Sequence, residues 1–249
     1  MKIKVQKDNF SSFLLPVSRI SDANISCAIH IESDYLYVVS HDASAVCIYY
    51  AKHVPIKIED VSEPFVIYVS DIRKVINAID VIDEDEIILN ITSKFISYES
   101  PTIKFKCYLL DPAVAAAEKI SAKMIDSFKF DTEFVMNTNT FSKINKGCTF
   151  TDNKGKIYFY TNAENKKVYV DLDDKSANHS VNNITFIAAD GYIGSDLTPT
   201  SPLSIDTFKI ISALKHDVQT KVNITKGAYM FYYRDGNTEI KYLLRALKS

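Results

Sequence analysis

The chain has 249 residues, of which 47% are hydrophobic and 24% charged, and its formal net charge is −2. This is the composition of an ordinary soluble globular protein, and the charge excludes a uniformly basic coat for nucleic acid but permits a locally basic surface. The four cysteines (Cys27, Cys47, Cys107 and Cys148) are far apart. We therefore expect buried, reduced thiols in a cytoplasmic protein. No apolar run approaches the roughly 18 residues of a membrane span, so no membrane association is expected.

The first half of the sequence alternates strands with two short helices. Apolar residues at helical spacing predict helices at 8–19 and 71–79. Pro16 should interrupt the first helix, and Ser70 or Asp71 should cap the second. Runs rich in Val, Ile, Tyr and Phe predict strands at 1–6, 26–32, 35–40, 45–52, 54–58, 65–70, 86–92, 94–99 and 103–110.

The second half repeats this pattern after an Ala-rich segment, 111–126, that has no strand alternation. Helical spacing recurs at 139–147 and 206–216, with Asp206 as the expected cap of the latter. The predicted strands are 128–136, 148–152, 156–161, 166–172, 183–189, 202–205, 218–224, 228–234 and 239–247.

The order of these elements is a fourfold repeat of strand, short helix and three strands. Such a repeat indicates an α+β protein of two similar domains, each containing two βαβββ units. We place the N-terminal domain at 1–110, the connector at 111–126 and the C-terminal domain at 127–249.

Basic residues concentrate in the predicted helices. Segments 7–19, 71–79, 139–147 and 206–216 contain eight basic and three acidic residues, so they carry +5 and the remaining chain −7. A basic layer on an acidic protein suits sequence-independent contact with phosphates. On charge alone, the favoured interpretation is that short amphipathic helices solvate their outer faces with lysine.

The sequence contains no signature of catalysis or of a bound cofactor. All six glycines lie at or after Gly147, without the close spacing of a phosphate-binding loop. The acidic run 80–86 lacks the pattern of a calcium loop and is expected to be a solvated turn. The five histidines are not paired at metal-ligand spacing. We therefore predict a protein that is not an enzyme and has neither a cofactor nor a metal site.

Several segments resemble the DNA sliding clamp family, in particular the two-domain clamps related to proliferating cell nuclear antigen. They are HDASAVCI (41–48), DIRKVINAI (71–79), IKFKCYLLDP (103–112), FSKINK (141–146) and IKYLLRAL (240–247). The resemblance implies a clamp fold with helices on the inner face of a ring and sheets outside. It also implies a homotrimer around double-stranded DNA that tethers a DNA polymerase and is opened by a clamp loader. Pro16 and Arg245 depart from the family pattern.

The resemblance also carries residue roles over by position. For DNA binding it implies Arg19, Arg73, Lys74, Lys143, Lys146, Lys209 and Lys215. For partner binding it implies His41, Ala45, Ala228, Leu244 and Ala246, beside the 111–126 connector. For the subunit interface it implies strands 103–109 and 166–172, taken as edge strands, with Ile103, Phe105, Val168 and Val170 as contacts.

Three other functions are compatible with the sequence. The chain could be a clamp-fold viral factor that acts as a monomer in replication or transcription, or a β-rich structural virion protein. It could also be a hydrolase whose residues converge from separate loops. Few glycines and abundant Lys, Asn and Ile favour an AT-rich genome such as a phage's, which would place the protein in the host cytoplasm or nucleoid. The mass in solution discriminates best, because a trimer favours the ring.

Overall fold

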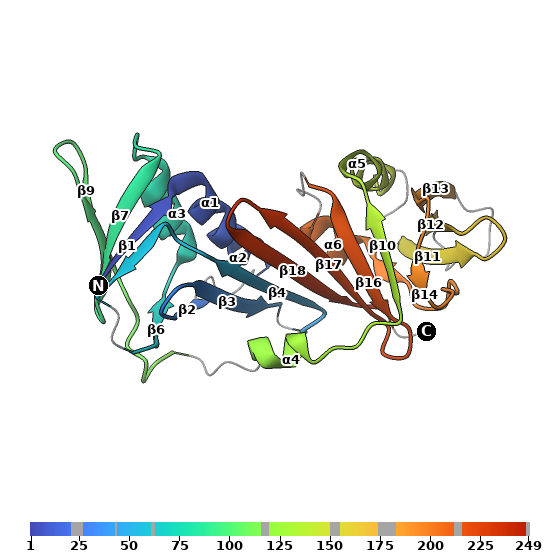
Figure 1. Cartoon of the computed structure of the whole chain (residues 1–249), viewed down its shortest axis with the longest axis horizontal. Coiled ribbons are helices and arrows are strands. Elements are labelled where there is room, and N and C mark those ends of the chain that lie inside the picture. The colour runs from blue at the N-terminus through green and yellow to red at the C-terminus, as the bar shows by residue number, and fades with distance from the viewer. Residues whose placement is uncertain are drawn as a thin grey trace. The chain divides into compact units, whose positions relative to one another are not determined.

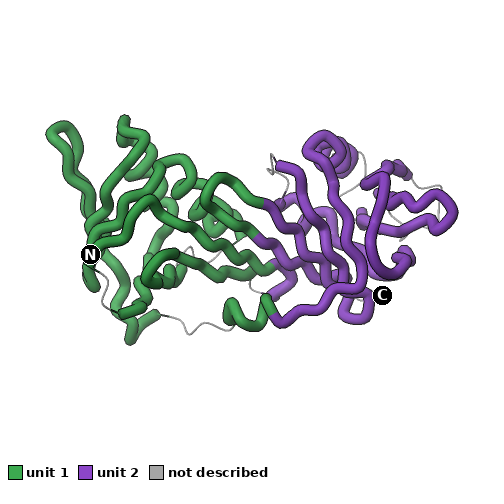
Figure 2. Tube along the Cα trace, in the orientation of Figure 1, with its two compact units in different colours: residues 1–43, 48–126, 234–240 green, residues 44–47, 127–233, 241–249 purple. Residues whose placement is uncertain are grey.

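The computed structural model describes residues 1–20, 27–42, 44–60, 63–115, 120–149, 155–173, 183–211 and 216–247. The chain forms two compact units, shown in Figure 2. Unit 1 contains residues 1–43, 48–126 and 234–240, and unit 2 contains residues 44–47, 127–233 and 241–249. Each unit therefore includes a short segment from the other half of the sequence.

The strands of unit 1 form antiparallel sheets (Figure 1). One sheet has the order β5 (Lys57–Glu59), β1 (Lys2–Gln6), β7 (Glu86–Ile91), β8 (Phe95–Glu99) and β9 (Lys104–Tyr108). The other has the order β4 (Cys47–His53), β3 (Leu36–His41), β2 (Cys27–Ile31) and β6 (Phe65–Val69). In β1, Ile3 and Val5 are buried whereas Lys2 and Lys4 are not. This alternation leaves one face of the sheet for the core and one for solvent.

The helices of unit 1 are α1 (Lys7–Leu14), α2 (Val17–Ile20) and α3 (Ile72–Asp80). Pro16 lies between α1 and α2, which confirms the predicted interruption. Asp71 caps α3 as predicted, because its carboxylate accepts a hydrogen bond from the Arg73 backbone N–H at 3.1 Å. Both longer helices bury an apolar face, formed in α1 by Phe10, Phe13 and Leu14 and in α3 by Ile72, Val75, Ile76 and Ile79.

The core of unit 1 contains one histidine, His53. Its ring lies 5.7 Å from the ring of Phe10 and 5.6 Å from that of Phe13, and its Nδ1 hydrogen-bonds with the Thr238 hydroxyl at 2.8 Å. The Thr238 hydroxyl also lies 3.4 Å from the Asn9 carbonyl, and the Val54 N–H donates to the Asn237 carbonyl. Burial lowers the pKa of His53 to about 4. Residues 237 and 238 therefore help to build the core of the N-terminal half.

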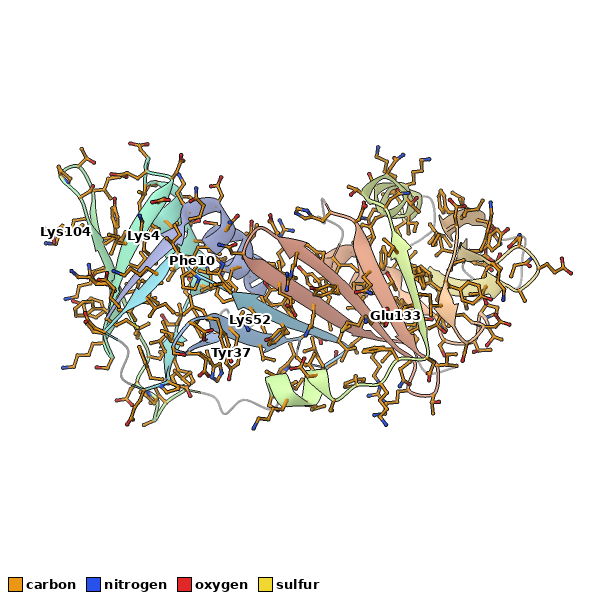
Figure 3. All side chains as sticks on the ribbon, viewed as in Figure 1. Lys4, Phe10, Tyr37, Lys52, Lys104 and Glu133 are labelled. Atoms are coloured by element: carbon orange, nitrogen blue, oxygen red, sulfur yellow. The ribbon has the colours of Figure 1, made fainter. Side chains whose placement is uncertain are left out.

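Unit 2 also contains antiparallel sheets. Five strands pair in the order β14 (Ile193–Gly194), β10 (Thr132–Met136), β16 (Val218–Asn223), β17 (Ala228–Asp235) and β18 (Thr238–Arg245), of which residues 234–240 are assigned to unit 1. The other sheet has the order β13 (Ile184–Ala189), β12 (Lys167–Asp173), β11 (Lys156–Asn162) and β15 (Leu203–Ser204). Polar side chains pair on the solvent face of the first sheet, where Glu133 of β10 accepts from Lys221 at 2.7 Å and from Gln219 at 2.9 Å (Figure 3 labels Glu133).

The helices of unit 2 are α5 (Thr138–Gly147) and α6 (Ile205–Ile210). They contact each other through Phe141 and Phe208, whose ring centroids are 5.2 Å apart. Phe208 in turn packs edge-on against Phe231 of β17. At the end of α5, a Cβ on Gly147 would lie 2.7 Å from the Leu172 side chain, so glycine allows the helix to approach the sheet closely.

Some predictions about local structure are wrong. Asp206 does not cap α6, because β15 leads directly into a helix that begins at the buried Ile205 and places Asp206 in its first turn. Residues 148–149 of the predicted strand 148–152 form a turn, and 150–152 lie outside the described residues. The third repeat therefore uses β11, β12 and β13. The connector contains a short helix, α4 (Ala122–Asp126), held by the buried Ile125.

Candidate nucleic-acid interface and partner surface

The helix α3 exposes two of the cations predicted to bind DNA. Because its apolar residues face the core, Arg73 and Lys74 of the first turn point to solvent. The Arg73 guanidinium lies 3.6 Å from the Asp71 carboxylate that caps the helix. On this surface, therefore, one of the two cations already has a nearby carboxylate.

The neighbouring helices α1 and α2 contribute Lys7 and Arg19. Lys7 is half-buried, and its ammonium donates to the Ile82 carbonyl at 2.7 Å. Arg19 is exposed. The carboxylate of Asp80, at the end of α3, accepts a hydrogen bond from the Ser11 hydroxyl of α1.

The helix α5 presents Lys143 and Lys146 on its solvent face, opposite the buried Phe141 and Ile144. Asn137 caps it by accepting from the Thr140 N–H at 2.8 Å. Burial raises the pKa of the Cys148 thiol, which follows the helix, to about 11, although the charge of Lys209 acts in the opposite direction. The thiol is therefore neutral at pH 7 and adds no negative charge beside Lys146.

The helix α6 carries Lys209, whose ammonium lies 3.7 Å from the Asp206 carboxylate one turn earlier. Lys215, the last predicted DNA-binding residue, lies outside the described residues.

The residues predicted to bind a partner differ in exposure. In unit 2, the Arg245 N–H donates to the Val46 carbonyl at 2.8 Å and the Ala246 N–H to the Gly227 carbonyl at 2.7 Å. These bonds bring the segments that contain Ala45, Ala228 and Ala246 together. Ala45 and Ala246 are half-buried, but Ala228 is only 5% exposed and Leu244 is fully buried. Leu244 therefore belongs to the core and supports this surface from below.

His41, the remaining predicted partner residue, belongs to unit 1. It ends β3, is half-buried, and its Nδ1 donates to the carbonyl of the next residue, Asp42, at 2.8 Å. The connector is described on either side of residues 116–119, with Val114 72% exposed and Ile120 and Ile125 buried.

The two strands predicted to form subunit contacts occupy different positions. The strand β9 is an edge strand, and Lys104, Lys106 and Tyr108 are exposed on it (Figure 3 labels Lys104). Its Lys106 ammonium lies 3.7 Å from the centre of the Phe95 ring. Ile103 and Phe105 are half-buried.

The prediction that 166–172 is an edge strand is wrong. Its strand, β12, pairs with both β11 and β13, and the side chains of Val168 and Val170 are fully buried in unit 2. The edge strand beside β12 is β13, where Thr185 and Ile187 are exposed and Ile187 has 46% of its surface accessible. Alternation along 166–172 identified a strand but could not tell which strand covers it.

The described residues contain no group of three His, Cys, Asp or Glu side chains placed to hold a metal ion. The acidic run 80–86 forms an exposed turn between α3 and β7, in which only Ile82 is buried. Across the ranges given above, no helix is long and apolar enough to cross a membrane.

Neither protein-family models nor curated protein sequences match the chain. Solved structures do match it over its whole length. PCNA of A. fulgidus, bound to the C-terminal region of FEN-1, has a TM-score of 0.80 at 11% identity, covering 100% of this chain and 98% of that one. A PCNA2–PCNA3 complex from Sulfolobus tokodaii has a TM-score of 0.72 at 13% identity, covering 99% of each chain. A putative DNA polymerase III beta subunit from Eubacterium rectale gives 0.74 at 14% identity, covering 100% of this chain and 66% of that one.

The chain has the DNA sliding-clamp fold. The predicted α+β class is confirmed, and the order of strands and helices agrees with the prediction except at 148–152. Within this clamp fold, sequence reasoning missed the exposed β13 edge and the polar residues Asn139 and Ser142, which share the solvent face of α5 with Lys143 and Lys146. Asn139 lies four residues before Lys143, and Ser142 four residues before Lys146, so helical spacing could have identified both.

Proposed function

We propose that the protein is a sliding clamp, which assembles into a ring around duplex DNA and tethers a DNA polymerase without catalysing a reaction. The observation that supports this most strongly is the match to clamp structures over the entire chain, at TM-scores up to 0.80. The exposed cations of α3, α5 and α6 add to it, because a ring that slides requires sequence-independent contact with phosphates.

The proposed ring is a homotrimer with head-to-tail contacts. Three chains of two similar domains give a ring of six similar domains. A head-to-tail contact forms a closed ring when the rotation between neighbouring chains adds up to a full turn. We assign the contact to the edge strands β9 and β13, because unpaired edges otherwise favour aggregation. Ile103 and Phe105 remain the proposed subunit contacts on β9. On the other edge, Ile187 of β13 replaces Val168 and Val170 as the proposed subunit contact.

Partner binding is proposed at the surface of unit 2 that contains Ala45 and Ala246; His41 and the connector, which the resemblance also implies, belong to unit 1. The A. fulgidus clamp binds the C-terminal region of FEN-1, and a corresponding peptide from a polymerase or a clamp loader is the expected ligand here. Small side chains at Ala45 and Ala246 leave room for an apolar anchor, and Leu247 is 37% exposed nearby in the sequence. Arg245, which directly precedes Ala246, is exposed and favours a peptide with an acidic residue.

Topological retention on DNA tests the proposal. The protein is incubated with circular duplex DNA, and its subunits are then cross-linked to one another. The complex is washed at high salt and recovered, and the DNA is cut once. A ring stays on the circle through the wash and leaves after linearisation. A protein that is monomeric at every concentration and is washed from circular and linear DNA alike would contradict the proposal.

A pair of variants tests the interface. Ile187→Asp on the β13 edge should prevent trimer formation in sedimentation experiments, because a charge at an apolar contact is costly. Ile193→Asp is the matched control, since Ile193 of β14 is 78% exposed and lies outside the assigned edges. If Ile187→Asp still forms trimers, β13 is not the subunit contact.

A further inference from the structure

The proposed DNA-binding cations are not equivalent, because their surroundings differ between the two units. In unit 1 the solvent face of α3 contains Arg73, Asn77 and Asp80, spaced by four and three residues. Asp80 therefore shares the exposed face with Arg73. Asp71 lies beside Arg73 at 3.6 Å, and Asp8 is exposed on the adjacent α1.

Lys7, the lysine of α1, does not offset these carboxylates at the surface. Its ammonium is directed to the Ile82 carbonyl at 2.7 Å, which removes it from the face that would meet DNA. The remaining charges of α1, α2 and α3 are then three exposed cations, Arg19, Arg73 and Lys74, against the exposed carboxylates of Asp8 and Asp80 and the half-buried carboxylate of Asp71. Such a surface offers little attraction for a phosphate backbone.

In unit 2 the balance between cations and carboxylates on the exposed helix face is different. The helix α5 contains two lysines and no acidic residue. Its exposed residues Asn139, Ser142, Lys143 and Lys146 recur at helical spacing and can all donate hydrogen bonds to phosphate oxygens. Figure 3 shows nitrogen-tipped side chains extending outward around α5.

Among the described residues, the carboxylates of Asp217 and Asp206 contact α5 and α6 respectively, and neither pairs with the α5 lysines. The Asp217 carboxylate accepts hydrogen bonds from the N–H and hydroxyl of Thr138, at the opposite end of α5 from Lys146. The Asp206 carboxylate lies 3.7 Å from Lys209 within α6. In the described part of the chain, Lys143 and Lys146 have no ion-pair partner.

We infer that α5 is the principal phosphate-binding element of each chain, and that the α1–α3 surface contributes little to DNA contact. The inference rests on the proposed clamp function and refines it, because the proposal itself would allow all helices to contribute equally. A clamp that contacts DNA through one helix per chain touches the duplex at separated points, which suits weak and mobile contact.

Counterion release sets the expected size of the effect. Each phosphate neutralised contributes a slope of about −0.9 to the dependence of log K on log salt. Two lysines per helix therefore contribute about −1.8 for each α5 engaged. When salt rises from about 50 to about 200 mM, the contacts of these two lysines with phosphate therefore account for roughly a tenfold loss of affinity for DNA.

The experiment compares two charge-matched double variants of the full chain. Lys143→Gln with Lys146→Gln removes two charges from α5, and Arg73→Gln with Lys74→Gln removes two from α3. Binding to a short labelled duplex is measured by fluorescence anisotropy from low to moderate salt. Circular dichroism and sedimentation establish that each variant keeps the fold and assembly of the wild type.

We expect the α5 variant to lose at least about tenfold in affinity at low salt and to show a shallower salt dependence. The α3 variant should change by less than about twofold, because Arg73 already lies beside the Asp71 carboxylate and Lys74 shares its surface with Asp8 and Asp80. Equal losses in both variants, or a larger loss in the α3 variant, would overturn the inference and leave the proposed function standing. If the wild type binds no duplex even at low salt, both the proposed function and the inference are contradicted.

Discussion

His53 should make the stability of unit 1 depend on pH. Its side chain is 1% exposed, and burial lowers its pKa from 6.5 to about 4. Between these values the unfolded chain binds a proton that the folded protein does not, so stability is complete above about pH 6.5 and falls as the pH falls towards 4. At about 1.4 kcal/mol for each pH unit, the full effect is about 3 kcal/mol.

Substitution of His53 by leucine, which is similar in volume and cannot be protonated, should remove this component. Urea unfolding at pH 7 and pH 4 measures it, with tyrosine fluorescence as the signal. The wild type should lose about 3 kcal/mol more than His53→Leu between the two pH values. Carboxylates titrate in both proteins and cancel in the comparison. If the two proteins lose equal stability, the buried imidazole is not the origin of the pH dependence.

Substitutions at three further positions test the local structure, each by thermal unfolding. Gly194→Ala should destabilise the protein by more than about 2 kcal/mol, because φ is +100° at this position and a Cβ would meet the Asp131 carbonyl oxygen. Asp71→Ala should cost about 1 kcal/mol through loss of the α3 cap, and Asp71→Asn, which still accepts the hydrogen bond, should cost less. Tyr49→Phe removes a buried hydroxyl that donates to the Phe13 carbonyl at 2.8 Å and should cost about 1 kcal/mol, so an unchanged melting temperature would contradict that role.

Features determined by local chemistry could be predicted from the sequence. Pro16 cannot continue a helix wherever it lies, and an aspartate before an apolar run with helical spacing has few roles other than a cap, as at Asp71. The alternation of β-branched and aromatic residues likewise identified most strands. The predicted order of strands and helices indicated the fold, because it repeats a βαβββ unit four times.

Features that depend on contacts distant in sequence could not be predicted in this way. Whether 166–172 forms an edge depends on β13, which pairs with it from residues 184–189. Leu244 has the pattern of an accessible apolar residue, but its burial depends on the packing of unit 2 as a whole. Likewise, Lys7 counts as a surface cation in the sequence, and only the Ile82 carbonyl, 75 residues away, shows where its charge is directed.

The assignment of residues 234–240 to unit 1 has a consequence for the order in which the protein is made. At about 5–20 residues per second, a ribosome needs roughly 6 to 23 seconds to extend the chain from Asp126 to Ile240. During that interval the N-terminal half lacks the hydroxyl of Thr238 that hydrogen-bonds with His53, and the turn at Gly236 that packs against Asn9. The nascent N-terminal half therefore has an incomplete core until translation is almost finished, and a fragment ending at Asp126 should behave as a chaperone substrate.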